Sequence, residues 1–383
     1  MKQYIKQFGS YLLVAVLSTV VTLAMVNAQI GLVPSKLDQM QGLIEKCFVG
    51  EADMAAAEDA AADAMVNALG DRWSYYLSAE EYEAHQEQMN NAYVGVGITI
   101  QATEDSSGFH ILEVVSGGPA EEAGLLVGDI LIAVEGQSVS EMDTSGVRDV
   151  VKGKEGTFVS LTVLRGQEEL TFSVERRQVQ TPVATYEMLE DNIGLVSIVN
   201  FDARCSEETI AAIEALLEEG AEKLVFDVRY NPGGYASELV KVLDYLLPEG
   251  ELFRAVTYDG EESIDYSDAD FLDIPMAVLV NAHSYSAAEF FAAALSEYEA
   301  AVVVGEKTVG KGYFQYTYEL NDGSALGLSV GKYYTPKGVS LAEVGITPDI
   351  VVELDEETES KLYYGILEWS EDPQLQAAVE ALQ

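Results

Sequence analysis

Two residues in the second half of the chain have the chemistry of a nucleophile and a base. Ser286 follows the apolar run 276–280 and stands where a helix is expected to begin, with small neighbours that leave its hydroxyl accessible. Lys311 follows the run 301–304 and lies between two glycines, which let its backbone approach a tight site. A serine hydroxyl becomes a strong nucleophile once a base takes its proton, and lysine is a base only when burial keeps its amine neutral. Together they would cleave an acyl bond.

A glycine turn after a third apolar run provides candidate oxyanion donors. The run 224–228 leads through Pro232 into Gly233 and Gly234. A turn of this kind can direct N–H groups outward, and the unpaired N–H groups of a helix that begins near Ser286 can also stabilise negative charge. Taken singly, each feature has a simpler interpretation: an ordinary strand-to-helix turn, a helix-capping serine and a solvated lysine.

Alternating strands and helices must position these residues. From residue 193 onward the apolar pattern predicts a parallel sheet with right-handed helical crossovers. In such sheets sites form at the carboxyl ends of the strands, where all three loops lie. The expected strands are 193–198, 224–228, 276–280 and 301–304, and the expected helices are 206–217, 237–247 and 286–298.

The composition excludes several classes of function. The 383 residues contain 21 Lys+Arg and 65 Asp+Glu, a net charge of −44, which excludes nucleic acid and electrostatic docking on anionic lipid. The hydrophobic content of 48% can fill the cores of two or three domains. Cys47 and Cys205 are expected to be free thiols, and the three scattered histidines predict no metal site.

The N-terminus has the pattern of an export signal. Lys2 and Lys6 precede an apolar run of about 16 residues, 11–26, and small residues ending at Ala28 occupy the positions that a signal peptidase recognises. We expect residues 1–28 to be a signal peptide or, if uncleaved, a membrane anchor. The catalytic part would then lie on the extracytoplasmic side, secreted or at the cell membrane.

Two further units precede the parallel sheet. Residues 35–92 have apolar residues at helical spacing and predict a helical segment. Residues 93–178 have the strand alternation of a separate β-rich unit.

The β-rich unit resembles a PDZ domain of the circularly permuted bacterial kind. The turn glycines and strands follow in order from Gly95 to Arg165. The resemblance implies that such a unit binds the C-terminal residues of a peptide by strand addition, with the loop Gly95, Val96, Gly97 and Ile98 capturing the terminal carboxylate. A small β-domain that serves only as a spacer is the alternative.

The ordered motifs as a whole resemble the C-terminal processing peptidases, or tail-specific proteases, which are Ser–Lys endopeptidases. The PDZ-like unit, the glycine turn, the serine loop and the Lys311 block follow in order, and further blocks continue to residues 345–350. In that family the nucleophile and the lysine are 25 positions apart, as Ser286 and Lys311 are, which favours Ser286 over Ser284. The resemblance implies that Gln315 orients the lysine and that N–H groups of Ala287 and of Gly233 or Gly234 hold the oxyanion.

The resemblance also implies the architecture and the function. It predicts an α/β chain, α+β overall, with a crotonase-like αββ protease core at 179–354, a PDZ-like insertion at 93–178 and helical segments at 35–92 and 355–383 that support a homodimer. No cofactor is implied. The chain is expected to be an exported serine endopeptidase that binds protein C-terminal tails and hydrolyses peptide bonds.

Some positions depart from the family pattern. Tyr285 replaces a usual alanine and places a ring beside the nucleophile, and Ala288 replaces a common serine. Lys152 stands where arginine is frequent, so coupling between peptide binding and activation could differ, because lysine lacks the bidentate fork.

Three other functions compete with this interpretation. A catalytically silent scaffold would use only the PDZ-like groove. A Ser-His-Asp triad would use His283, although three residues of loop do not naturally set the required hydrogen bond. An acyl-CoA enzyme would share the core fold by analogy alone.

Overall fold

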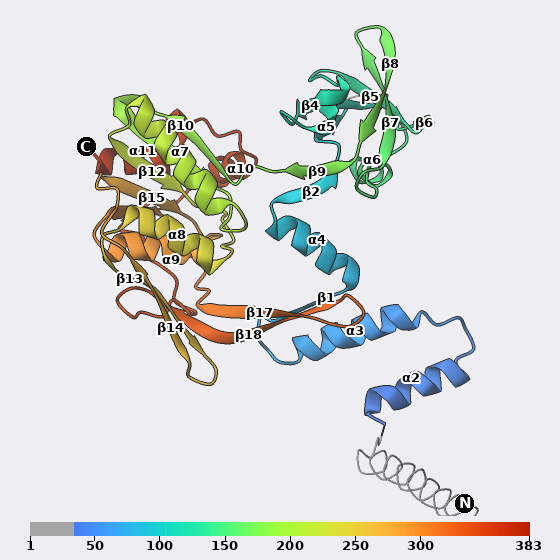
Figure 1. The fold of residues 1–383 in the computed structure, drawn as a ribbon, viewed down its shortest axis with the longest axis horizontal. Coiled ribbons are helices and arrows are strands. Elements are labelled where there is room, and N and C mark those ends of the chain that lie inside the picture. The colour runs from blue at the N-terminus through green and yellow to red at the C-terminus, as the bar shows by residue number, and fades with distance from the viewer. Residues whose placement is uncertain (1–33, 104) are drawn as a thin grey trace, which may run out of the picture. The chain divides into compact units, whose positions relative to one another are not determined.

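The computed structural model describes residues 34–103 and 105–383, so the predicted export segment 1–28 lies outside the described residues. The chain divides between Gly70 and Asp71 into two compact units (Figure 1). Among the described residues, no helix has both the length and the apolar character needed to cross a bilayer. Cys47 and Cys205 are free thiols, as expected.

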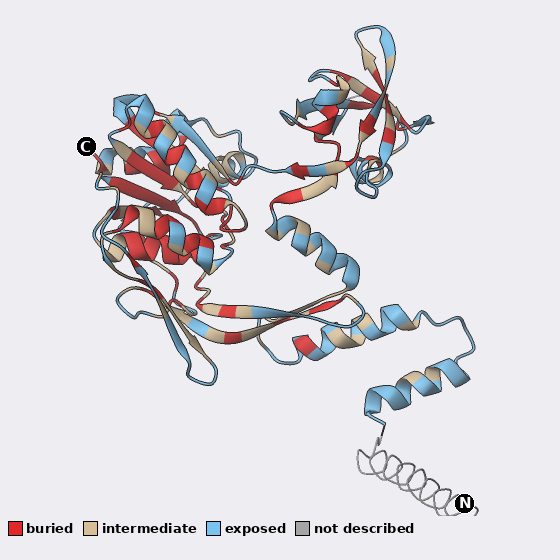
Figure 2. Cartoon of the chain, viewed as in Figure 1, coloured by how far each residue is buried: buried red, intermediate tan, exposed pale blue. Residues whose placement is uncertain are grey.

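The first unit contains two capped helices. They are α2 (Lys36–Cys47) and α3 (Met54–Asn67). The side chain of Ser35 accepts a hydrogen bond from the Asp38 N–H, and that of Asp53 accepts one from the Ala56 N–H. No residue of α2 is buried, and Figure 2 shows this helix almost entirely exposed.

A six-stranded sheet forms the centre of the second unit. The order is β10-β11-β12-β15-β16-β19, and only β10 runs antiparallel to its neighbour. The bounds are β10 (Ala184–Met188), β11 (Ile193–Ile198), β12 (Lys223–Asp227), β15 (Met276–Val280), β16 (Ala301–Gly305) and β19 (Ile350–Val351). The predicted parallel sheet is therefore confirmed.

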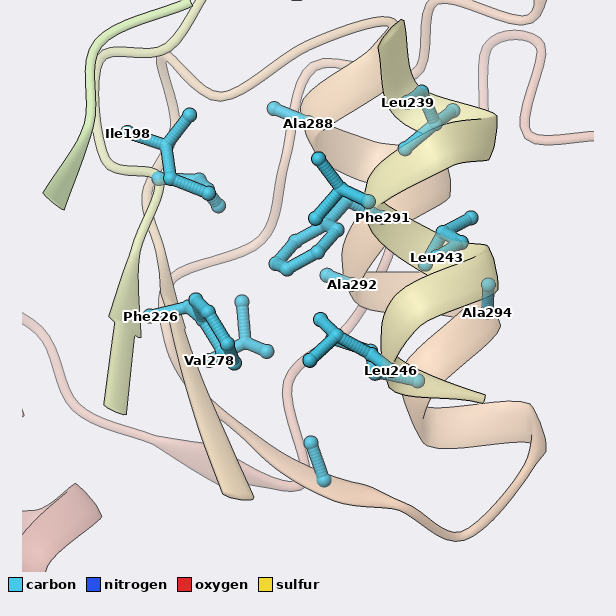
Figure 3. Packing of buried hydrophobic residues seen from close by; sticks show 14 of the residues in the cluster. Ile198, Phe226, Leu239, Leu243, Leu246, Val278, Ala288, Phe291, Ala292 and Ala294 are labelled. Carbon is cyan, nitrogen blue, oxygen red and sulfur yellow. The ribbon is translucent and has the colours of Figure 1, made fainter. Parts of the chain in front are cut away.

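Helices cover both faces of this sheet. Phe226 and Val278 belong to the core shared with α7, α8 and α9, and Figure 3 shows them facing side chains such as Phe291. The alternate residues Val225 and Ala277 belong to the opposite core, together with residues of α11. The bounds are α7 (Cys205–Glu219), α8 (Ala236–Leu246), α9 (Ala287–Glu297), α10 (Glu356–Tyr363) and α11 (Pro373–Ala381).

A second, antiparallel sheet was not predicted. It consists of β1 (Tyr75–Leu77), β13 (Gly250–Thr257), β14 (Glu262–Ser267), β17 (Tyr313–Glu319) and β18 (Ala325–Tyr334). The expectation of helix across the segment 35–92 is wrong at β1, whose residues pair with β18. The helix that follows, α4 (Ala79–Met89), begins with the expected capping box of Ser78 and Glu81.

The PDZ-like unit has its own sheet and core. The main strands are β3 (Ile98–Ala102), β4 (Phe109–Val114), β5 (Ile130–Val134), β7 (Phe158–Arg165) and β8 (Glu168–Glu175), and β6 (Gln137–Ser138) pairs with β5. The helices are α5 (Pro119–Ala123) and α6 (Thr144–Val151). A separate ribbon of β2 (Ala92–Gly95) and β9 (Arg177–Gln180) flanks the unit in sequence. In the part of the chain that the structure describes, β3 pairs only with β4, and its other edge is open.

Candidate active site

Three loops meet at the carboxyl edge of the parallel sheet. Because β12, β15 and β16 are adjacent and parallel, the loops that follow them leave the sheet on one side. The Tyr285 N–H donates to the Asn231 carbonyl at 3.1 Å, and the Val309 N–H donates to the Ser284 carbonyl at 3.3 Å. The loops that carry the predicted oxyanion donors, the nucleophile and the base are therefore hydrogen-bonded to one another at one edge of the sheet.

Ser286 lies at the start of α9 in a strained conformation. Its φ is 58° and its ψ is −126°, a backbone region that L-residues rarely adopt. A Cβ atom on Gly233 would lie 2.7 Å from Ser286 Cβ and 2.8 Å from the Ala287 nitrogen. Only glycine can therefore let the turn approach the nucleophile this closely.

The two glycines of the turn differ in the availability of their N–H groups. The Gly233 N–H donates to Asn231 Oδ1 at 2.8 Å. Within residues 105–383, the N–H groups of Gly234 and Ala287 have no such partner. These two donors are free to bind an oxyanion in this conformation.

Glu289 joins the serine loop to the lysine loop. Its Oε2 accepts hydrogen bonds from the N–H groups of Ser286 at 3.0 Å and Lys311 at 2.8 Å. Its Oε1 accepts hydrogen bonds from the Gly310 N–H at 2.7 Å and from the Thr308 hydroxyl. The residue is fully buried, and burial raises the pKa of its carboxyl against the effect of these four donors.

Lys311 lies in an aromatic cage. Its Nζ is 4.8 Å from the ring centroid of Trp73 and 5.8 Å from that of Tyr285. Burial lowers the pKa of Lys311 to about 8, although the negative charges of Asp71 and Glu289 oppose the change. An appreciable fraction of this amine is therefore neutral near physiological pH, as a general base requires.

Ser286, Lys311 and Gln315 line one cavity of about 1050 Å³. Gly233, Gly234 and Tyr285 also line it. Gln315 donates from its Nε2 to Ser329 Oγ at 3.0 Å. Within the described range 105–383, no hydrogen bond links the Lys311 amine to Ser286 or to Gln315. The three residues share a cavity, and the Ser–Lys–Gln relay implied by the family resemblance is not formed in this conformation.

Arg229 fixes the glycine turn to the C-terminal helix. Its guanidinium is buried and pairs with Asp227 at 2.6 Å and with Asp372 at 2.7 Å. It also donates to Gln374 Oε1 at 3.0 Å. Charge from both aspartates outweighs burial and raises the pKa of Arg229 above its usual value.

His283 points into a different cluster. Its ring stacks on Tyr230 with centroids 5.1 Å apart, and its Nε2 is 3.9 Å from a Glu359 carboxylate oxygen. It does not line the cavity of Ser286. The geometry therefore gives no support to a Ser-His-Asp triad.

Three residues that shape the site escaped the sequence interpretation, and one of them, Asp202, lines the cavity. Glu289 stands three residues after Ser286, a capping-box spacing that could have marked it. Asp202 follows β11, another strand ending at this edge, so a survey of polar residues beyond all strand ends could have found it. Trp73 had no such signal, because it is distant in sequence and reaches Lys311 through tertiary packing alone.

The PDZ-like unit has a groove beside its open strand. A cavity of about 470 Å³ lies along β3 and α6, and its lining includes Gly95, Val96, Gly97 and Ile98. Gly97 has a φ of +76°, which favours glycine. Lys152 also lines the groove. The four predicted residues therefore lie together at a groove suited to strand addition.

Comparisons with known proteins find relatives of the parallel-sheet core and of the PDZ-like unit. Residues 192–352 match the model of peptidase family S41, and residues 110–165 match the model of a PDZ domain. A protein of Staphylococcus aureus strain COL, named "Probable CtpA-like serine protease", is 32% identical over 356 residues, 90% of this chain and 71% of the relative. The same protein in strain N315 is 32% identical over 323 residues, 83% of this chain. The chain spans 64% of that relative's length.

A solved structure shares the fold. An S41 protease from Bacteroides fragilis superposes with a TM-score of 0.53 at 18% identity, covering 83% of this chain and 89% of the other. At this identity the likeness concerns the fold alone.

Proposed function

Because this chain belongs to peptidase family S41, we propose that it is a serine endopeptidase in which Ser286 is the nucleophile and Lys311 the general base. The observation that carries the assignment is the pairing of a strained serine with a lysine of lowered pKa, about 8, in one cavity. The buried Glu289 supports the pairing, since it binds the backbone of both residues.

The residues suggest a definite sequence of steps. The neutral Lys311 amine takes the Ser286 proton while Oγ attacks the substrate carbonyl carbon. The N–H groups of Gly234 and Ala287 bind the resulting oxyanion. Lys311 then gives the proton to the leaving amine, and water repeats the attack to release the acyl group. Because Lys311 has no hydrogen bond to Ser286 in the described structure, this mechanism requires the Lys311 amine and the Ser286 hydroxyl to approach each other when substrate binds.

The PDZ-like groove is proposed to select the substrate. A peptide C-terminus would add a strand to β3, whose outer edge is unpaired, and its carboxylate would meet the loop from Gly95 to Ile98. Export to the extracytoplasmic side remains a proposal that rests on the sequence of residues 1–28. A homodimer is proposed on the exposed apolar side chains of α2, including Met40 and Leu43.

Cleavage of an unfolded protein by the full chain tests the catalytic assignment. Wild type should cut the substrate, and Ser286→Ala and Lys311→Ala should each reduce the rate by about 10³-fold or more. Ser296→Ala and Lys307→Ala are matched controls outside the cavity and should retain activity. If wild type binds tail peptides and cleaves nothing, the silent-scaffold alternative is correct.

A further inference from the structure

Asp202 is held against the glycine turn that faces the nucleophile. The N–H of the preceding Phe201 donates to the Gly233 carbonyl at 2.7 Å. A Cβ atom on Gly234 would lie 2.6 Å from Asp202 Oδ1, just as one on Gly233 would meet Ser286. Only two glycines therefore separate this carboxyl group from the reacting centre.

One oxygen of the Asp202 carboxyl group, Oδ1, has no hydrogen-bond partner in the described part of the chain. Its exposed fraction is 4%, and among the described residues its Oδ1 is the only buried side-chain nitrogen or oxygen without a hydrogen bond. Burial raises the pKa of Asp202 to about 7. A buried carboxylate without a partner is destabilising, and a charged or hydrogen-bonding group from outside the chain would remove that penalty.

The residues that line the cavity indicate which kind of external group could bind Asp202. Among the described residues that line this cavity, Asp202 is the only one with a carboxylate, and eight others are tyrosines. Burial is the main cause of the raised phenol pKa of Tyr235 and of Tyr285, and the negative charge of Asp202 adds to it, so both rings lie near this carboxyl group. Aromatic ring faces and a carboxylate together can bind a positively charged group at the end of a long aliphatic side chain.

A metal ion is a poorer match than an organic cation. Calcium and magnesium require several oxygen ligands, and one carboxylate does not supply them. Within the described part of the chain, no group of three or more His, Cys, Asp or Glu side chains is arranged to hold a metal.

We propose that Asp202 forms an acidic subsite that selects a lysine or arginine side chain of the substrate next to the scissile bond. This inference rests on the proposed function of the cavity. The net charge of −44 works in the same direction, because it raises the local concentration of basic peptides.

Paired peptides test the subsite in the full chain. After the cut sites in an unfolded protein are mapped by mass spectrometry, peptides around one site are made with Lys or Met at each of the four positions nearest the cut. At one position wild type should cleave the Lys peptide with kcat/KM about tenfold higher. Asp202→Asn should bring this ratio close to one, and the exposed Asp265→Asn should leave it unchanged.

Two results would overturn the subsite. One is equal cleavage of Lys and Met peptides by wild type at all four positions. The other is a Lys preference that survives in Asp202→Asn and also in Asp202→Ala, each shown to be folded by circular dichroism.

Binding separates failure of the subsite from failure of the peptidase. In the Ser286→Ala background, fluorescence anisotropy should show an otherwise uncharged peptide with one central Lys binding about tenfold more tightly than the same peptide with Met, and Asp202→Asn should remove the difference. This pair of peptides is chosen without reference to any cut site. A wild type that cleaves nothing but retains this difference refutes the catalytic assignment alone. Equal binding of both peptides refutes the subsite, even if cleavage occurs.

Discussion

Lys311 has an environment that changes its chemistry without any hydrogen bond to the nucleophile. The Trp73 and Tyr285 rings exclude water from its amine, and this desolvation is the largest influence on its pKa. The rings also attract an ammonium group through cation–π interaction. This attraction favours the ammonium form and opposes the effect of desolvation, which is the larger of the two and leaves the pKa of Lys311 lowered.

Activity should increase with pH through the Lys311 titration. The neutral amine is the working base, so kcat/KM for a peptide without basic residues should rise about tenfold per pH unit and level off near pH 8. Trp73→Ala admits water to the amine, and the midpoint should move toward the ordinary lysine value. Lys307→Ala should leave the profile unchanged. A flat profile between pH 6 and 9 would contradict Lys311 as the base.

At the scale of elements, Glu289 fixes the relative position of two loops. Glu289→Gln replaces one acceptor oxygen with an NH₂ group, which would then face N–H and O–H donors. The free energy of unfolding should therefore fall by roughly 3 kcal/mol. It should also reduce kcat by at least about tenfold, because the backbones of Ser286 and Lys311 lose a common acceptor. Urea unfolding and peptide kinetics measure both effects. Glu218→Gln, on the exposed face of α7, should change neither; equal effects in both variants would refute the bridging role.

The ion pairs of Arg229 connect β12 with the start of α11. Arg229→Met leaves Asp227 and the buried Asp372 without their cation, so the free energy of unfolding should fall by about 3–5 kcal/mol. Arg254→Met removes partly exposed pairs with Glu251 and Glu262 and should lower it by less than about 1 kcal/mol. Thermal and urea unfolding of both variants provide the comparison. Similar losses would show that burial does not set the strength of these pairs.

The elements that could be predicted are those with a strong local signal. Residues 276–280 form a continuous apolar run, and β15 has these bounds. β17 instead contains polar and aromatic residues and pairs with β18 across a register shift. Its strand character depends on long-range pairing, which has no local pattern.

The same distinction applies to the site. Ser286 and Lys311 could be located because each follows a predicted strand, and the structure brings both to one cavity. The Trp73 cage could not be predicted, because contact between residues 73 and 311 depends on packing. The hydrogen bond from Gln315 to Ser329 likewise depends on long-range pairing, because the two residues are register partners of β17 and β18.

For the whole molecule, the excess of acidic residues should govern encounters with substrates. Cleavage of a lysine-rich unfolded protein should slow several-fold between about 50 and 500 mM NaCl, because salt screens the attraction. An acidic unfolded protein of similar length should show no such decrease. Initial rates measured at several salt concentrations check this prediction, and identical salt responses would remove long-range attraction as a factor.

The position of α11 in the fold has a consequence for truncation. Leu375, Ala378 and Leu382 cover one face of the parallel sheet, and Asp372 completes the pairing of Arg229. Removal of residues 372–382 would expose that apolar face to water and leave the buried guanidinium of Arg229 with Asp227 alone. A deletion that is distant from Ser286 in the sequence would therefore weaken the support of the loop that faces the nucleophile.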